Sequence, residues 1–390
     1  MAKEKDEIII VIDPGHGASQ KGAEYNGLEE KNINMAVSAA MAEELEKYEG
    51  IQVHLTHTSA EDEMSIRERA EFARDVEADY FFCIHFNASG NHNFYGAEAW
   101  ITSYGRYYAE MKAFSEIVLQ EFEEIGVYNR GIKTKLETDG TDYYGVLRRN
   151  AEFDIPAVII EHCHMDHDED AQFLDEETDL VNFGKMDATA VAKFLKLKSS
   201  ELGVDYTNYN VIIGEEPKEK IQNDTTQPEC HIEYVTFNNE EETATFRITA
   251  RDEEYPILYY GYSVDGGETY TTLQRWEKDK DTMEFTVSYP EYTSDGVSVV
   301  VYNAFNIGAE TDALVAEEVL EQKEILRQQK LETKDLFYES AVMVQPKSGG
   351  EIYLITAGIS LLAVVGVLIW YVCDWRKTRK NLKEINGQMK

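Results

Sequence analysis

Three short segments of this 390-residue chain carry side chains that could together bind a metal ion. His16 lies in the run Asp-Pro-Gly-His-Gly, Glu30 opens a helical stretch, and His85 lies in the run Ile-His-Phe-Asn. Two imidazoles and one carboxylate are a ligand set of catalytic zinc, and they leave the fourth coordination position for water. The pattern therefore predicts a zinc site made of His16, Glu30 and His85. Glu29 is the alternative carboxylate, although at a helix start it would point roughly 100° away from Glu30.

A further carboxylate, Glu161, ends the apolar run Ala-Val-Ile-Ile and could act as an acid–base group. The carboxyl ends of parallel strands meet at one edge of an α/β sheet, where ligands bind. Glu161 would then take a proton from the attacking water and return one to the leaving amine. On spacing alone a structural interpretation competes with this one, because a histidine at a strand end is more often structural than a ligand.

The elements that must position these residues alternate between strand and helix over residues 7–198. Continuous apolar runs predict buried parallel strands, and apolar residues at helical spacing predict the helices between them. The expected fold is α/β, with a central, mostly parallel sheet and helices on both faces. The expected strands are 8–13, 52–56, 80–85 and 157–161, and the expected helices are 32–48, 65–76, 107–125 and 187–197.

Residues 8–197 resemble the zinc-dependent N-acetylmuramoyl-L-alanine amidases of the Amidase_3 type. Members of that family cut the bond between N-acetylmuramic acid and L-alanine in peptidoglycan. The order and the approximate intervals of the shared segments agree with the family. These segments are Asp13–Gly17, Glu30-Lys31, Leu55-Thr56, Arg69, His85–Ala88, Gly96, Arg130–Ile132, Val146–Arg148 and Pro156–Glu161.

The resemblance implies a role for individual residues. The two histidines and Glu30 would bind one zinc ion per catalytic domain, and Glu161 would be the catalytic acid/base. Asn87 and Arg148 would contact the peptidoglycan substrate. Because all of the ligands and the glutamate are present, the resemblance implies an active enzyme rather than an inactive relative.

The chain departs from the family pattern at three places. Ala18 stands where a second glycine is common, and His57 stands where an arginine is usual. After Glu161 the family often has Gly-Phe-x-Ser-Asn, whereas this chain has a histidine-rich stretch at residues 162–167. This stretch is expected to line the pocket, and a second metal site is the alternative interpretation.

The second half of the chain changes character. Residues 199–227 are polar without periodicity and predict a linker, and the alternating pattern of 228–310 predicts a small β-sandwich of immunoglobulin or fibronectin type. This β-domain could bind a protein or a glycan, or serve as a spacer. Residues 311–351 predict a solvated helical stalk, with a self-associating coiled coil as the alternative. The sequence does not indicate an oligomeric state.

Residues 352–373 contain no charged side chain, and the segment is long enough to cross a bilayer. Aromatic residues flank them, and the tail 374–390 is basic, which predicts a plasma-membrane anchor with the tail in the cytoplasm and the catalytic domain outside. No export signal is visible at the N-terminus, so we expect a leader that this chain lacks. The net charge of −37 makes nucleic acid an unfavourable partner.

These observations favour zinc-dependent hydrolysis of peptidoglycan by a membrane-tethered amidase. A non-catalytic, membrane-tethered scaffold that only binds peptidoglycan is the alternative, and metal analysis with a zymogram would separate the two. A cytoplasmic, tail-anchored hydrolase that acts on another amide is a further alternative, which protease protection in intact cells would test.

Overall fold

The computed structural model describes residues 7–288 and 291–342. Within these ranges, the residues up to Ala316 form one compact unit. Helix α7, which spans Glu317–Val342, belongs to a second unit.

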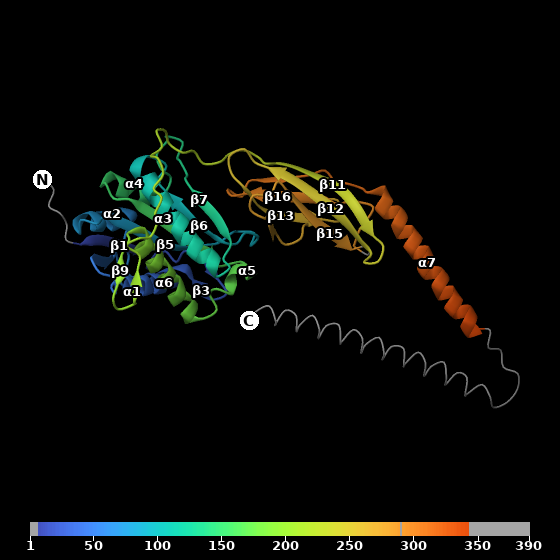
Figure 1. The fold of residues 1–390 in the computed structure, drawn as a ribbon, viewed down its shortest axis with the longest axis horizontal. Helices are drawn as coiled ribbons and strands as arrows, with labels where there is room; N and C mark the ends of the chain where they lie inside the picture. The colour runs from blue at the N-terminus through green and yellow to red at the C-terminus, as the bar shows by residue number, and fades with distance from the viewer. Residues whose placement is uncertain (1–6, 289–290, 343–390) are drawn as a thin grey trace, which may run out of the picture. The chain divides into compact units, whose positions relative to one another are not determined.

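A six-stranded sheet forms the centre of the N-terminal half of the chain (Figure 1). All neighbouring strands pair in parallel except one pair, β6 and β8, which is antiparallel. The sheet confirms the predicted α/β fold with a mostly parallel centre, and it adds two strands, β6 and β7, to the expected set. In order across the sheet, the strands are β4 (Ile51–Leu55), β1 (Ile8–Pro14), β5 (Tyr80–Asn87), β8 (Ala157–His164), β6 (Ala97–Ile101) and β7 (Asn129–Lys133).

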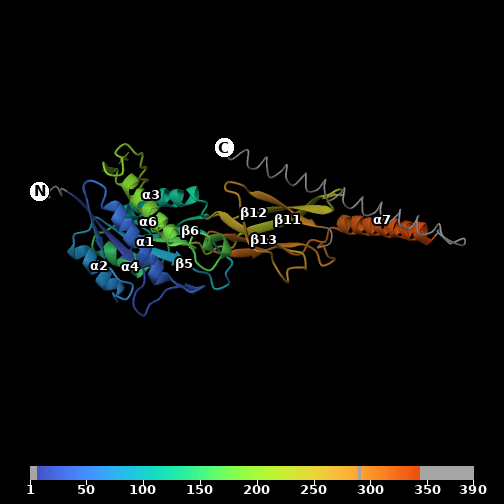
Figure 2. The ribbon, with the colours of Figure 1, turned by 90° about the horizontal axis from the view of Figure 1, so that it is seen from below.

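Helices cover both faces of this sheet, as the sequence predicted (Figures 1 and 2). Successive side chains of a strand point to opposite faces, and β1 shows the consequence. Ile10 and Ile12 pack in the larger core with α1, α3 and α6, whereas Val11 packs in a smaller core with α2 and α4. The helices are α1 (Glu30–Leu45), α2 (Ile66–Asp75), α3 (Gly105–Glu124), α4 (Gly145–Glu152), α5 (Asp168–Ala171) and α6 (Glu177–Phe194).

Residues 228–310, called the β-module below, contain only antiparallel strands among their described residues. They form a three-stranded sheet, in the order β11-β12-β15, and a four-stranded sheet, in the order β14-β13-β16-β17. Two antiparallel sheets are what an added all-β domain requires, and the immunoglobulin or fibronectin type stays a prediction. The strands are β11 (Glu229–Asn238), β12 (Thr243–Arg251), β13 (Ile257–Ser263), β14 (Gln274–Arg275), β15 (Thr282–Ser288), β16 (Ser298–Asn303) and β17 (Gly308–Glu310).

Short strands flank the main elements. The pair β2 (Glu24–Tyr25) and β3 (Leu28–Glu29) immediately precedes α1. The pair β9 (Lys198–Ser199) and β10 (Val204–Asp205) falls at the start of the segment predicted as a linker. Tyr206, Tyr209 and Val211 of that segment pack against the larger core, so its first part is folded onto the sheet domain.

Helix α7 lies inside the segment predicted as a stalk. Among the described residues, none of the helices combines the length and the apolar character that a membrane crossing needs. The predicted membrane segment, 352–373, and the basic tail, 374–390, lie outside the described residues.

Candidate metal centre

His16, Glu30 and His85 come together where strands β1 and β5 end and helix α1 begins. One possible ligand atom from each residue lies within 4.8 Å of those of the other two. Nε2 of His16 is 3.0 Å from one oxygen of Glu30, and Nδ1 of His85 is 2.9 Å from the other. Among the described residues, no other group of His, Cys, Asp and Glu side chains is close enough together to hold a metal ion.

The side chain of Glu30 points into this site, whereas that of Glu29 lies outside it. Glu30 is only 4% exposed, and it accepts hydrogen bonds from the backbone N–H groups of Ala23 and Phe86 at 2.8 and 3.1 Å. Glu29 instead pairs with Lys21 at 2.7 Å. The carboxylate in the group is therefore Glu30, and the alternative assignment to Glu29 finds no support.

Burial and hydrogen bonding shift the pKa of the Glu30 carboxyl in opposite directions. Burial raises its pKa, but hydrogen bonds from His16 and His85 outweigh burial and hold the pKa well below the usual range of a glutamate. Glu30 is thus an anion that both imidazoles face, which is the charge arrangement that a divalent cation needs.

Two glycines allow the three side chains to approach this closely. A Cβ atom on Gly15 would lie 2.3 Å from Cε1 of His85. Gly22 has a φ of +72°, and its Cβ atom would lie 2.2 Å from Oε2 of Glu30. Both positions therefore exclude a side chain, the second for its backbone conformation as well.

Arg69 holds the loop that carries His16. Its Nη1 donates to Oδ1 of Asp13 at 2.6 Å and to the carbonyl of Pro14 at 2.7 Å, and its Nη2 donates to the carbonyl of His16. Thr56 donates to the same Asp13 oxygen at 2.6 Å. His16 itself has a φ of 69°, a left-handed conformation that this clamp maintains. Arg69 stood out in the sequence only through the family resemblance.

Glu161 lies beside this group on β8, in register with His85 on β5. Its Oε2 atom is buried and has no hydrogen-bond partner among the described residues. Burial raises the pKa of Glu161 well above its usual value, the carboxylates of Glu30 and Glu98 raise it further, and Lys133 opposes the shift. A buried carboxyl that has no hydrogen-bond partner among the described residues and lies next to this group can exchange a proton with a bound reactant.

The two predicted substrate residues are already engaged within the chain. Asn87 donates through Nδ2 to Glu98 at 3.1 Å and accepts from the N–H of Ala88 at 2.9 Å. Arg148, on α4, donates to the carbonyl groups of Asp142 and Tyr143. Their contact with substrate stays a prediction.

The histidine-rich stretch after Glu161 is part of the core, so the expectation that it lines the pocket is wrong for its first members. His162 is fully buried, with Nε2 2.8 Å from Asp187 and Nδ1 3.0 Å from the carbonyl oxygen of His85. Nδ1 of His164 lies 3.0 Å from the carbonyl oxygen of Gly96. These side chains fasten β8 to its neighbours, and within the described residues they form no second metal cluster.

Comparison with known proteins relates this arrangement to a family. The family described as N-acetylmuramoyl-L-alanine amidase (Amidase_3) matches residues 10–193, a range that includes both histidines of the group, Glu30 and Glu161. The N-acetylmuramoyl-L-alanine amidase CwlM of Bacillus licheniformis is 31% identical over 195 residues, which are 50% of this chain and 71% of that protein. A sporulation-specific N-acetylmuramoyl-L-alanine amidase of Bacillus subtilis (strain 168) is 30% identical over 195 residues, or 50% of this chain and 70% of that protein.

A solved structure is also similar. It is the catalytic domain of CwlV, an N-acetylmuramoyl-L-alanine amidase from Bacillus (Paenibacillus) polymyxa var. colistinus. The match has a TM-score of 0.43 at 23% sequence identity and covers 49% of this chain and 99% of that structure.

Proposed function

The chain belongs to the N-acetylmuramoyl-L-alanine amidase family and is an enzyme of that class; from this premise we propose that it cleaves peptidoglycan with a zinc ion held by His16, Glu30 and His85. The bond cleaved is the amide between N-acetylmuramic acid and L-alanine. The observation that carries the proposal is the convergence of the three ligand atoms within 4.8 Å.

The residues present fit a zinc ion. Two imidazole nitrogens and a buried, anionic carboxylate are a known donor set for catalytic zinc. Backbone N–H groups and Asn34, which donates to Oε1 of Glu30 at 3.3 Å, fix the carboxylate from behind. Zinc bound there would polarise the substrate carbonyl and lower the pKa of water and of neighbouring carboxyl groups.

We assign Glu161 the role of proton carrier. It takes a proton from the attacking water, whose oxygen adds to the amide carbonyl carbon. It then delivers that proton to the nitrogen of L-alanine as the carbon–nitrogen bond breaks. Its Oε2 atom supports this role, because no other group among the described residues forms a hydrogen bond with it.

Replacement of Glu161 with glutamine tests this role. Glu161→Gln keeps the size of the side chain and removes its ability to carry the proton, so we expect normal zinc content and a loss of turnover of at least about 100-fold. Purified peptidoglycan is the substrate, and released amino groups are measured. The matched control, Glu29→Gln, changes a neighbouring carboxylate that lies outside the group and should keep normal turnover. Normal turnover by Glu161→Gln would show that another group carries the proton.

We also propose, from the sequence, the division of the chain into a catalytic domain at 7–198, a linker at 199–227, a β-domain at 228–310, a stalk at 311–351 and an anchor at 352–373. The uncharged stretch in the last segment and the basic residues after it support a plasma-membrane anchor with the catalytic domain outside.

A further inference from the structure

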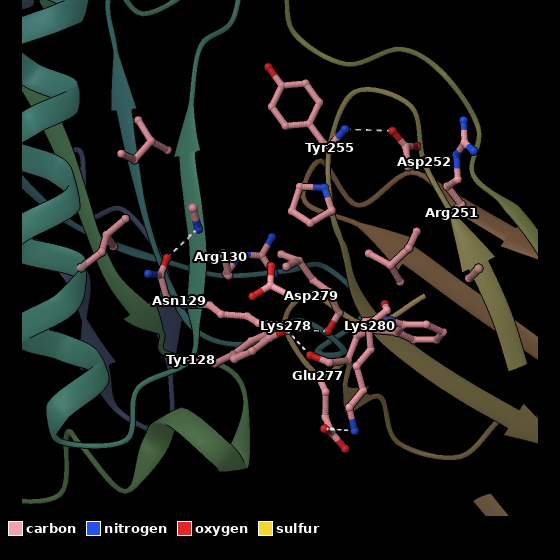
Figure 3. Close-up of a pocket in the computed structure, with 18 of the residues that line it drawn as sticks. Tyr128, Asn129, Arg130, Arg251, Asp252, Tyr255, Glu277, Lys278, Asp279 and Lys280 are labelled. Atoms are coloured by element: carbon pink, nitrogen blue, oxygen red, sulfur yellow. Dashed lines mark hydrogen bonds and ion pairs between the residues drawn. The ribbon is translucent and has the colours of Figure 1, made fainter. Parts of the chain in front are cut away.

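The β-module contacts the sheet domain within one compact unit. Tyr128 donates to the carbonyl group of Leu258 at 2.8 Å, and Lys278 pairs with Glu123. Between the two parts opens a pocket of about 750 Å³, with Tyr128 and Arg130 on the side of the sheet domain and Tyr255 and Lys278 on the side of the module (Figure 3).

Arg130, on the edge strand β7, joins the two parts directly. It is only 1% exposed, and its guanidinium donates in three directions. Nε donates to Glu98 of the sheet domain at 2.7 Å. Nη1 donates to the hydroxyl of Tyr259 at 2.6 Å, and Nη2 donates to Oδ1 of Asn306 at 2.8 Å. Two of the three acceptors of this buried cation therefore come from the β-module.

The carboxylate of Glu98 accepts hydrogen bonds from Arg130 and from three other side chains. One of its oxygens accepts from Asn87 at 3.1 Å and from Trp100 at 3.0 Å. The other accepts from Arg130 at 2.7 Å and from Lys133 at 2.6 Å. Four donors fix this carboxylate, and hydrogen bonds in such a network strengthen one another.

The network lies next to the proposed proton carrier. Glu98 is the register partner of Glu161 in the antiparallel pair of β6 and β8, and Glu161 is the register partner of His85 on β5. Directly opposed residues share a face of the sheet, with Cβ atoms about 5 Å apart. One row of side chains thus runs from His85 through Glu161 and Glu98, and Arg130 continues it to Tyr259 of the module.

We propose that the β-module is a working part of the active site, in which Tyr259 and Asn306 are positioning residues that hold Arg130 against Glu98 and thereby fix the surroundings of Glu161. This inference rests on the proposed function. It gives the module a role in turnover, beyond that of a spacer or a binding domain.

Two variants of the full-length chain test the proposal. Tyr259→Phe removes the hydroxyl, which accepts from Arg130 and donates to the carbonyl of Tyr95. Asn306→Gly removes only the acceptor of Arg130 and keeps the left-handed backbone of that exposed residue, whose φ is 62°. Each leaves one N–H of a buried cation without its acceptor. We expect kcat to fall about tenfold in each, with KM little changed because neither residue belongs to the proposed zinc ligands or to the predicted substrate contacts.

Matched controls separate this route from a general loss of packing. Tyr260→Phe removes a hydroxyl from the next residue, which donates to Gln274 inside the module. Lys278→Ala breaks an exposed ion pair across the same interface without touching Arg130. Both controls should keep the kcat of the wild-type chain.

Hydrogen exchange gives a readout that does not need catalysis. Backbone amides of β6 should exchange faster in Tyr259→Phe and Asn306→Gly than in the two controls. Wild-type kcat and unchanged exchange in both variants would overturn the inference and leave the proposed function standing. A wild-type chain that cleaves no peptidoglycan would overturn the proposed function and this inference with it.

Discussion

At the scale of single residues, Gly22 shows how closely the backbone approaches the side chains of Glu30 and His16. An added Cβ atom would lie 2.2 Å from Oε2 of Glu30 and 2.6 Å from Cδ2 of His16. We therefore expect Gly22→Ala to displace two of the proposed zinc ligands and to lower the zinc content of the purified chain at least about tenfold under a competing chelator.

The control for this prediction is Gly27→Ala. Gly27 also has a positive φ, of 83°, so it shares the backbone strain, which costs about 1–2 kcal/mol. A Cβ atom there would meet nothing within 4 Å. Equal zinc retention by both variants would mean that the Gly22 position does not shape the metal site.

Residue types and positions predicted that His16, Glu30 and His85 meet at one edge of the sheet, and the structure brings these three side chains together; their role as zinc ligands stays a prediction. Residue types and spacing did not reveal the residues that support this group. Arg69 and Glu98 act through partners that are distant along the chain, such as Asp13 and Arg130, and a single sequence does not reveal such pairs. His162 was misjudged for the same reason, since its partner Asp187 comes from another element.

At the scale of elements, the contact between α1 and α6 positions Glu30, which begins α1. Gly184 of α6 lies against this helix, and a Cβ atom there would approach the carbonyl oxygen of Val37 to 2.6 Å and the N atom of Met41 to 2.7 Å. Alanine normally stabilises a helix by about 1 kcal/mol relative to glycine. Here the clash outweighs that gain, so we expect Gly184→Ala to lower the free energy of unfolding by about 1–2 kcal/mol.

Denaturant unfolding monitored by circular dichroism measures this change. Asn182→Ala, on the exposed side of α6, serves as the control and should stay within about 0.5 kcal/mol of the wild-type chain. A more stable Gly184→Ala chain would contradict the close approach of the two helices.

Two strands show why part of the sheet escaped prediction. The sequence of β7, Asn-Arg-Gly-Ile-Lys, carries two charges and a glycine, and β6 carries Glu98. Buried charges argue against a strand unless partners are known, and here the partners are each other and the β-module. By contrast, apolar runs or an alternating pattern indicated the four predicted strands of the sheet.

At the scale of the whole molecule, we expect the proposed catalytic domain to lie outside the membrane and the basic tail inside. Protease added to cells stripped of their wall should degrade residues 7–342 and leave a tag at the C-terminus protected. Protection of the catalytic domain would instead favour a cytoplasmic hydrolase.

The central claim is that this chain is a zinc-dependent amidase, and mass spectrometry of digested peptidoglycan tests it most directly. The full-length chain is incubated with purified peptidoglycan, with and without a zinc chelator. We predict stem peptides with a free N-terminal L-alanine, lost on chelation and restored by added zinc. Products cut at any other bond, or cleavage that continues undiminished under the chelator, would contradict the account.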